Sequence, residues 1–304
     1  MAISKIIILY GGTSSEREVS LESGAYIYQS IKDLGHEVVL LDYPDEFSLT
    51  SLQEDDFIFI ALHGADGESG ALQQTLQGKK IFYSGSNFQA CRNTWNKNTC
   101  KKLLQENNIL TPKWASVSSL YEIKNGLNDP LFDELRPFNS LFLKPEEDGS
   151  SIDVFKIKGE DDLQDAIQTS ANPDRPFIFE ECVDYKELTV PILNGKCLPA
   201  VEIRTSESFF NFNAKYINDD TQLSELELSE IAKKKLEQIC LKTFKVMGCE
   251  GWARIDLLQD QKGNFYVMEI NTVPGMTSHS LFPKSASSFG LSYNDLVQQI
   301  VQSK

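Results

Sequence analysis

The amino-acid sequence predicts an α/β protein, and three observations support this fold class. Short apolar runs typical of strands alternate with helical patterns from the first residues onward, which indicates a parallel sheet covered by helices. Late in the chain, two apolar runs flank the turn signal Gln261-Lys262-Gly263-Asn264 and predict a β-hairpin. The 304 residues, 41% hydrophobic and 24% charged, have an ordinary globular composition and suffice for two or three domains.

The predicted elements follow one another along the chain. In the first part, strands are expected at 5–10, 37–41 and 57–62, and helices at 19–34 and 71–76. Ser15 and Glu18 resemble a capping box at the start of the first helix. Beyond a boundary expected at 91–96, we predict helices at 98–107 and 226–247 and strands at 141–144, 152–157, 177–180, 252–258 and 265–270.

Charge and cysteine usage argue against several classes of protein. A net charge of −15 disfavours nucleic acid or an anionic membrane as the partner. The six cysteines are scattered without a CxxC pair and only three histidines are present, which disfavours structural zinc and predicts free thiols in a reducing cytosol. No apolar run reaches the length of a signal peptide or a membrane span, so a cytoplasmic protein is expected.

The predicted hairpin carries chemistry on one face. Because side chains alternate across a strand, Arg254 and Asp256 share a face, and so do Glu269 and Asn271 on the returning strand. Such oxygen ligands suit Mg²⁺, which proteins hold with a few carboxylates plus substrate phosphates. Arg254 beside them can stabilise an anionic intermediate. For any single position a solvated face is the better explanation, but the complete pattern favours a magnesium–nucleotide site.

A second candidate is the turn after a strand that ends at Lys144. The turn reads Pro-Glu-Glu-Asp-Gly-Ser-Ser, and its backbone N–H groups and hydroxyls could surround phosphates. Its acids, Glu146 to Asp148, would then have to point away from the phosphates. Alone, this pattern is typical of a plain hairpin loop, and Lys97 and Lys215 alone are typical of surface charges.

Five motifs in order, spanning nearly the whole chain, resemble those of the D-alanine–D-alanine ligases of the ATP-grasp superfamily. They are GGTSSEREVSLESG at 11–24, ALHGADGESGALQ at 61–73, KPEEDGSS at 144–151, AKY at 214–216, and GWARID with MEINTVPGMTSHS at 251–280. The resemblance implies an N-terminal Rossmann-like parallel α/β domain at 1–95. A two-lobed ATP-grasp fold would follow, with a central lobe at 96–183 and a C-terminal lobe at 184–304.

The resemblance also implies roles for individual residues. The implied catalytic set is Glu16, Ser150, Tyr216, Arg254, Gly275 and Ser280. The implied ATP-binding set is Lys97, Lys144, Ser151, Glu180, Glu181, Val183, Glu187 and Lys215. The dipeptide pocket would use Glu16, His63, Arg254, Gly275, Ser280 and Leu281, and Mg²⁺ would bind Asp256, Glu269 and Asn271. Taken singly, His63 at a strand end is better explained as bonding a backbone group.

The implied activity is ATP-dependent ligation of two D-alanines through an acyl phosphate, for peptidoglycan precursors. Two Mg²⁺ ions, replaceable by Mn²⁺, and a homodimer are expected from the same resemblance. One alternative is a D-Ala–D-X peptide or depsipeptide ligase, which Tyr216 disfavours because relatives that make D-alanyl-D-lactate typically differ there. Another is a non-catalytic nucleotide-binding protein, which the intact metal ligands disfavour.

The sequence departs from the family pattern at four places. Ser69 and Asn96 stand where Asp is usual, and Glu181 stands where Lys is frequent. After Gln222 the usual aromatic and Pro-Ala are missing. We therefore expect the acidic segment 219–230 to be displaced without nucleotide and to order over the phosphates with ligands.

Overall fold

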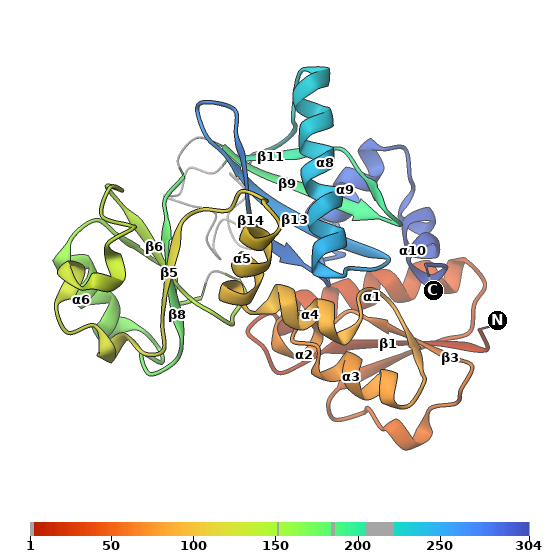
Figure 1. Cartoon of the computed structure of the whole chain (residues 1–304). Coiled ribbons are helices and arrows are strands. Elements are labelled where there is room, and N and C mark those ends of the chain that lie inside the picture. The colour runs from red at the N-terminus through yellow and green to blue at the C-terminus, as the bar shows by residue number, and fades with distance from the viewer. Residues whose placement is uncertain (1–2, 151, 184–185, 205–221, 304) are drawn as a thin grey trace.

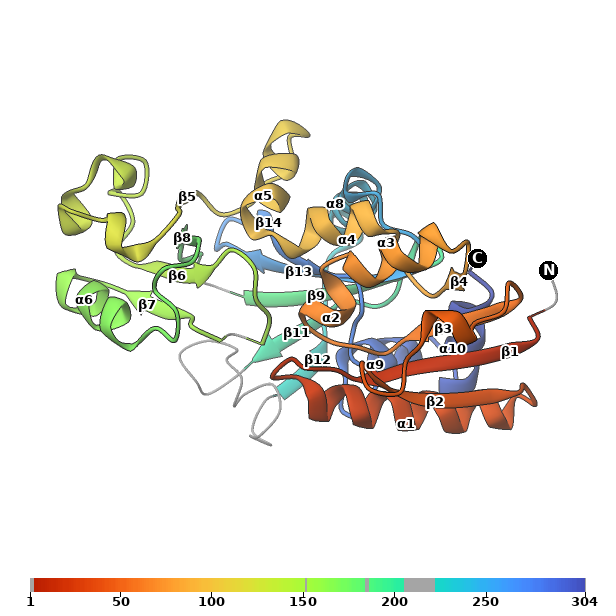
Figure 2. The ribbon, with the colours of Figure 1, turned by 90° about the horizontal axis from the view of Figure 1, so that it is seen from below.

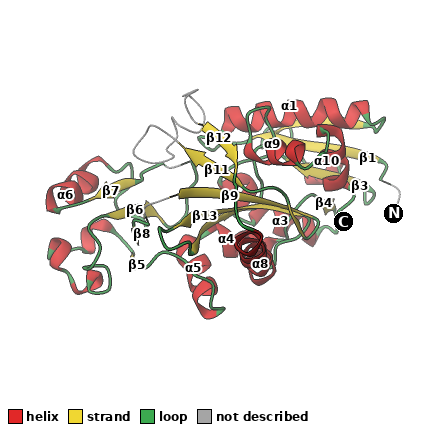
Figure 3. Cartoon of the chain, turned by 90° about the horizontal axis from the view of Figure 1, so that it is seen from above, coloured by secondary structure: helices red, strands yellow, loops and turns green. Residues whose placement is uncertain are grey.

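The computed structural model describes residues 3–150, 152–183, 186–204 and 222–303, whose strands form three sheets (Figure 1). The sheet formed by the last strands of the chain, β9 to β14, lies between the other two, as the view from above shows (Figure 3). The expected mixed α/β architecture, with a parallel first sheet followed by antiparallel sheets, is confirmed. The predicted division into domains at 95 and 183 remains a prediction.

The first sheet is parallel throughout, with the strand order β2-β1-β3-β4. Its strands are β1 Lys5–Gly11, β2 Val38–Tyr43, β3 Asp56–Ile60 and β4 Phe82–Tyr83. The accompanying helices are α1 Arg17–Asp33, α2 Ala65–Glu68, α3 Ala71–Gly78 and α4 Phe88–Trp95, with a short 3-10 turn at Leu49–Ser51. The predicted capping box is wrong: Glu16 is the N-cap of α1 and no side chain caps the helix. In place of Ser15, Ser14 takes part in a hydrogen bond at this end of the helix: its Oγ accepts from the Glu16 N–H at 3.2 Å.

The second sheet is antiparallel, with the order β5-β8-β6-β7. It comprises β5 Trp114–Val117, β6 Leu141–Pro145, β7 Phe155–Ile157 and β8 Phe177–Glu181, with α5 Lys97–Glu106, α6 Glu160–Thr169 and 3-10 turns at Leu120–Glu122, Gly126–Asn128 and Pro130–Phe132. The strand predicted from 152 begins only at Phe155. Ile152 N–H bonds the Gly149 carbonyl in a turn, and Asp153 has φ +53°, so neither residue is extended.

The third sheet is also antiparallel and has the order β12-β11-β9-β13-β14, with β10 paired to β9. Its strands are β9 Lys186–Leu193, β10 Lys196–Cys197, β11 Val201–Arg204, β12 Gln222–Glu225, β13 Trp252–Gln259 and β14 Phe265–Asn271. The helices of this part are α8 Glu230–Met247, α9 Leu281–Ser288 and α10 Tyr293–Val301. The predicted hairpin is therefore β13–β14. The helix predicted from 226 starts later, because Ser229 caps α8 by accepting from Ala232 N–H at 3.3 Å.

The C-terminal helices return to the first sheet. Ile6 and Ile8 of β1 share one apolar core with Trp252 of β13, Phe282 of α9 and Leu296 of α10. Figure 2 shows α9 and α10 beside α1 and β1. This packing brings the connection between β14 and α9 next to the start of α1, so that distant motifs meet at one place.

Candidate active site

The hairpin side chains form one polar cluster. Arg254 is paired in register with Asn271, and Asp256 with Glu269. The buried Asp256 carboxylate accepts from Arg254 Nε at 2.9 Å, Arg254 Nη2 at 2.8 Å and Asn271 Nδ2 at 2.9 Å. Thr189 Oγ1 of β9 donates to it at 2.6 Å. The strands thus place the four predicted residues on one face, as the alternation of side chains requires.

The donor set fits Mg²⁺ brought with a nucleotide. Asp256, Glu269 and Asn271 offer two carboxylates and an amide oxygen, which are hard ligands of the kind Mg²⁺ prefers. Among the described residues, no three His, Cys, Asp or Glu side chains gather into a metal site. The remaining ligands would therefore come from phosphate oxygens and water.

Two buried lysines share the Glu180 carboxylate. Lys101 Nζ lies 2.5 Å from Glu180 Oε2, and Lys144 Nζ lies 2.5 Å from Glu180 Oε1. Burial raises the pKa of Glu180, but the two ammonium groups outweigh burial and lower it to about 2. Burial lowers the pKa of Lys101, whereas for Lys144 the opposing effect of Glu180 prevails and its pKa is raised. Glu180 was predicted in the ATP-binding set, and its side chain forms ion pairs with Lys101 and Lys144.

The turn after β6 turns its acids toward protein donors. Asn96 Nδ2 donates to Glu146 Oε2 and to Glu147 Oε1, both at 3.0 Å. Ser116 Oγ also donates to Glu146, and Arg175 pairs with Asp148. An aspartate at 96 would face two carboxylates here, which explains why this chain carries the amide. All three acids therefore contact protein donors, and their orientation relative to a phosphate stays a prediction.

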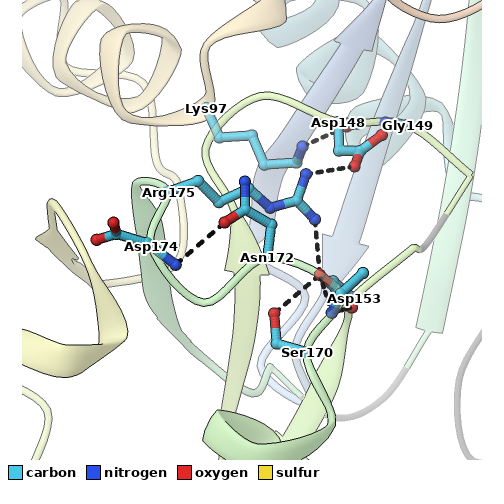
Figure 4. A network of polar contacts seen from close by, with 9 residues as sticks. Lys97, Asp148, Gly149, Asp153, Ser170, Asn172, Asp174 and Arg175 are labelled. Atoms are coloured by element: carbon cyan, nitrogen blue, oxygen red, sulfur yellow. Dashed lines mark hydrogen bonds and ion pairs between the residues drawn. The ribbon is translucent and has the colours of Figure 1, made fainter.

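Lys97 completes the turn from α5. Its Nζ donates to the Asp148 carbonyl at 2.6 Å, and its backbone N–H donates to the Glu146 carbonyl at 2.8 Å (Figure 4). Burial lowers its pKa, while the charge of Glu269 on the hairpin raises it. The charge of Glu269 also raises the pKa of Lys144. The hairpin and the turn therefore belong to one electrostatic site.

Glu16 and Ser150 meet beside the same turn. A Cβ added to Gly149 would lie 2.8 Å from Glu16 Oε2, so the carboxylate sits against this glycine. Ser150 has φ +52°, and its buried Oγ has no hydrogen-bond partner among the described residues. An orphaned buried hydroxyl is compatible with a partner yet to bind. Tyr216, the third member of the predicted set, lies outside the described residues, as do Ser151 and Lys215.

His63 is fixed by a chain of hydrogen bonds between the first sheet and the C-terminal segment. Its Nδ1 lies 2.9 Å from the Val273 carbonyl, which can only accept, so Nδ1 carries the proton. Nε2 then accepts from Ser23 Oγ at 3.3 Å, and that oxygen accepts from Met276 N–H at 3.1 Å. Burial lowers the pKa of His63 and favours this neutral form. The backbone bond expected of a lone histidine is present, and together with Ser23 it fixes the orientation of the ring.

Two of the predicted oxyanion and pocket residues, Gly275 and Ser280, lie in the connection from β14 to α9, and a third, Leu281, begins α9. Ser280 is the N-cap of α9, and its Oγ accepts from Thr277 N–H at 3.0 Å. A Cβ at Gly275 would lie 2.8 Å from Ser280 Oγ, so a larger residue at this position would have to displace the Ser280 hydroxyl. The Leu281 side chain is buried against Val201 and Ile203 of β11.

The predicted adenine hinge follows β8. Glu181 N–H donates to the Lys113 carbonyl at 2.8 Å, and Glu181 Oε2 accepts from Lys113 N–H at 3.1 Å. Glu181 thus anchors β8 to the segment before β5. Val183 is half-buried, and the charge of Glu187 on β9 raises the pKa of Lys144, so the two charges lie within electrostatic range of each other.

Glu68 is a site residue that the sequence reasoning missed. Burial and the charge of Glu16 raise its pKa to about 8, and Arg254 and Glu269 also act on it. Its Oε1 accepts from Gly64 N–H at 2.9 Å. The signal for Glu68 in the sequence is the acid of the Gly-Glu-Ser-Gly motif. Its neighbour Ser69 donates its hydroxyl to the Ala65 carbonyl at 2.5 Å.

Comparison with known proteins supports one family. Residues 105–302 match the family profile described as D-ala D-ala ligase C-terminus. A D-alanine–D-alanine ligase of Saccharophagus degradans is 37% identical over 302 residues, covering 99% of this chain and 94% of that protein. A D-alanine–D-alanine ligase structure from Bacillus anthracis, complexed with ATP, superimposes with a TM-score of 0.84 at 32% identity, covering 99% of this chain and 97% of the other. The VanG D-Ala:D-Ser ligase of Enterococcus faecalis has a TM-score of 0.84 at 23% identity, covers 98% of each chain, and shares the fold.

Proposed function

The chain belongs to the D-alanine–D-alanine ligase family, and we propose that it joins two D-alanines to D-alanyl-D-alanine for peptidoglycan precursors, with cleavage of ATP to ADP and phosphate. The observation that carries this proposal is the convergence of the hairpin and the lysine-bearing turn. Glu269 acts electrostatically on Lys97, Lys144 and Glu68, which come from other parts of the fold. Such a site suits phosphoryl transfer, where catalysis is mainly positioning and charge stabilisation.

In the first step, a carboxylate oxygen of one D-alanine attacks the γ-phosphorus of ATP. An O–P bond forms, the bond to the β-phosphate oxygen breaks, and ADP leaves an acyl phosphate behind. Lys97, Lys144 and Lys215 would stabilise the phosphates of ATP during the transfer. The backbone from Glu180 to Val183 and the carboxylate of Glu187 would bind the adenosine.

In the second step, the deprotonated amine of the other D-alanine attacks the acyl carbon. The C–N bond forms, the C–O bond to phosphate breaks, the nitrogen loses one proton to the departing phosphate, and inorganic phosphate leaves. Arg254 and the Gly275 N–H would bind the oxyanion between these events. Glu16, His63, Ser280 and Leu281 would line the dipeptide pocket, and the set of Glu16, Ser150 and Tyr216 would close the site against water.

Mg²⁺ would be held by Asp256, Glu269 and Asn271, whose side-chain oxygens are suitable ligands for this ion. Bound there, the ion would supply charge to offset the phosphates. Family resemblance further supports a homodimer and a cytoplasmic location as parts of this proposal. No helix in the described part of the chain combines the length and apolarity needed to span a bilayer.

The main competing function is ligation of D-alanine to a different second substrate. The shared fold of a D-Ala:D-Ser ligase is the observation that keeps this candidate open. ADP formation with Mg–ATP should be measured with D-alanine, L-alanine, D-serine and D-lactate, singly and paired with D-alanine, and the products identified by mass. We expect D-alanine alone to support turnover and D-alanyl-D-alanine to be the main product. A mixed product that dominates at equal concentrations would refute the assignment, and no turnover with any substrate would favour a non-catalytic nucleotide-binding protein.

A further inference from the structure

Arg175 joins two carboxylates across the turn that follows β6. It lies in the connection between α6 and β8, where its guanidinium packs over the Phe177 ring at 5.6 Å. Nη1 donates to Asp148 Oδ2 at 2.8 Å and Nη2 donates to Asp153 Oδ2 at 2.8 Å. Figure 4 shows the guanidinium between the two acids, with the Lys97 ammonium also directed at Asp148. A planar fork with two donor arms suits this bridge, and a lysine could not make it.

The two acids stand at the two ends of the Gly-Ser turn. Asp148 precedes Gly149, whose N–H donates to Asp148 Oδ1 at 2.9 Å. At the other end, Asp153 accepts from Ser170 Oγ at 2.9 Å and from Ala171 N–H at 3.1 Å. Ser150 at φ +52° and Asp153 at φ +53° adopt a left-handed conformation that costs free energy in non-glycine residues. Arg175 therefore helps to hold a strained turn at both ends.

The Arg175 guanidinium also compensates the negative charge of Asp148, the residue whose carbonyl Lys97 contacts. Glu146 and Glu147 accept hydrogen bonds from the neutral donors Asn96 and Ser116, whereas Asp148 is paired with a cation. Lys97 already donates to the carbonyl of Asp148 at 2.6 Å. Without Arg175, the Asp148 carboxylate would become available to pair with Lys97 and would repel a nearby phosphate. The Arg175–Asp148 contact, at 2.8 Å, is a charge-assisted hydrogen bond, and such bonds are among the stronger polar interactions in proteins.

We propose that Arg175 is a positioning residue for the nucleotide: it holds the turn in its phosphate-binding shape and compensates the charge of Asp148, so that Lys97 does not pair with the Asp148 carboxylate and can bind a phosphate. This inference rests on the proposed function, because that function puts the phosphates at this turn. Arg175 need not touch the nucleotide, since it acts through Asp148 and Asp153.

The test is binding of Mg²⁺ with a non-hydrolysable β,γ-imido ATP analogue to the full chain, measured by calorimetry. In R175M we expect binding to weaken about 10-fold, the size of one lost charge-assisted contact. In the D148N background the same R175M change should cost about threefold or less, because the carboxylate that Arg175 neutralises is gone. R175K keeps the charge without the bridge and should fall between wild type and R175M. R136M removes an exposed arginine of the same lobe, paired with Asp133, and should bind like wild type.

Several outcomes would overturn the inference. One is unchanged binding in R175M. Another is an equal loss in the wild-type and D148N backgrounds, because a purely structural role does not depend on the Asp148 charge. If R175M does not fold, as judged by thermal melting, the comparison of R175K with wild type decides, and equal binding would refute the bridge. A wild-type chain that binds no nucleotide refutes both this inference and the proposed function, whereas binding without ligation refutes only the function.

Discussion

Replacing Lys101 with Met should expose how much the buried ion triad of Lys101, Glu180 and Lys144 contributes to stability. The Lys101 ammonium is only 1% exposed, and it contacts Glu180 at 2.5 Å, Thr111 Oγ1 at 2.8 Å and the Pro112 carbonyl at 3.1 Å. Methionine keeps the length of the side chain but none of these contacts. The variant leaves a buried carboxylate with one cationic partner in place of two.

The expected loss follows from these contacts. Removing one partner of a buried ion pair costs about 3–5 kcal/mol. Lys144 remains beside Glu180, and the penalty for burying Lys101 is relieved, so we expect a loss at the lower end, about 3 kcal/mol at pH 7. The exposed neighbour provides the control, and K102M should change the free energy of unfolding by about 0.5 kcal/mol or less.

The loss of unfolding free energy in K101M should also depend on pH. The pKa of Glu180 is lowered from 4.5 to about 2 in the folded chain, so its charge contributes stability that is complete above pH 4.5 and is lost as pH falls toward 2. The difference between wild type and K101M should therefore narrow as pH falls through this range. Urea unfolding at several pH values measures both quantities. A difference below about 1 kcal/mol at pH 7, or one that does not narrow in acid, would refute the triad as a stabilising element.

Four further predictions concern the site. E269Q should lower turnover by roughly 10²-fold or more while the fold is kept, because a charged metal ligand is lost; full activity at saturating Mg²⁺ would contradict the metal assignment. Y216F should cost about 1–3 kcal/mol in transition-state stabilisation if Ser150 is left unpaired, measured as kcat/KM for D-alanine, and an unchanged rate would make Tyr216 a packing residue. Since the pKa of Glu68 is raised from 4.5 to about 8, its protonated form contributes stability below pH 4.5 that is lost as pH rises to 8; E68Q should flatten this decline in unfolding experiments, and an unaltered profile would assign the decline to other groups. The amides of β12, which lies at the edge of its sheet and pairs with β11 among the described strands, should exchange rapidly without ligands and be protected with Mg–ATP and D-alanine; equal strong protection in both states would indicate a fixed wall.

The described part of segment 219–230 differs from the expectation of an irregular lid. Gln222–Glu225 form strand β12, and Leu226 is buried and donates its N–H to the Ala200 carbonyl at 2.9 Å. The missing Pro-Ala had suggested an unconstrained loop. Pairing with β11 supplies a constraint that no local pattern in this segment reveals, because its partner strand lies before the intervening residues 205–221.

Local sequence patterns were enough to predict much of the fold and one face of the candidate site. Period-two alternation was enough to place Arg254 and Asp256 on one face, since a strand puts every second side chain on the same side. Strand and helix patterns were likewise enough for the parallel first sheet, and the order of five motifs was enough for the family.

Only the tertiary structure decided which distant side chains meet. Glu180 serves Lys101 and Lys144, Asn96 bonds the acids of the turn, and Arg175 bridges its two ends. In each case the partners come from different elements, 22 to 79 residues apart for the ion pairs, and no spacing rule links them. Their identity depends on how α5, β6 and β8 pack against one another, and packing is a property of the whole fold.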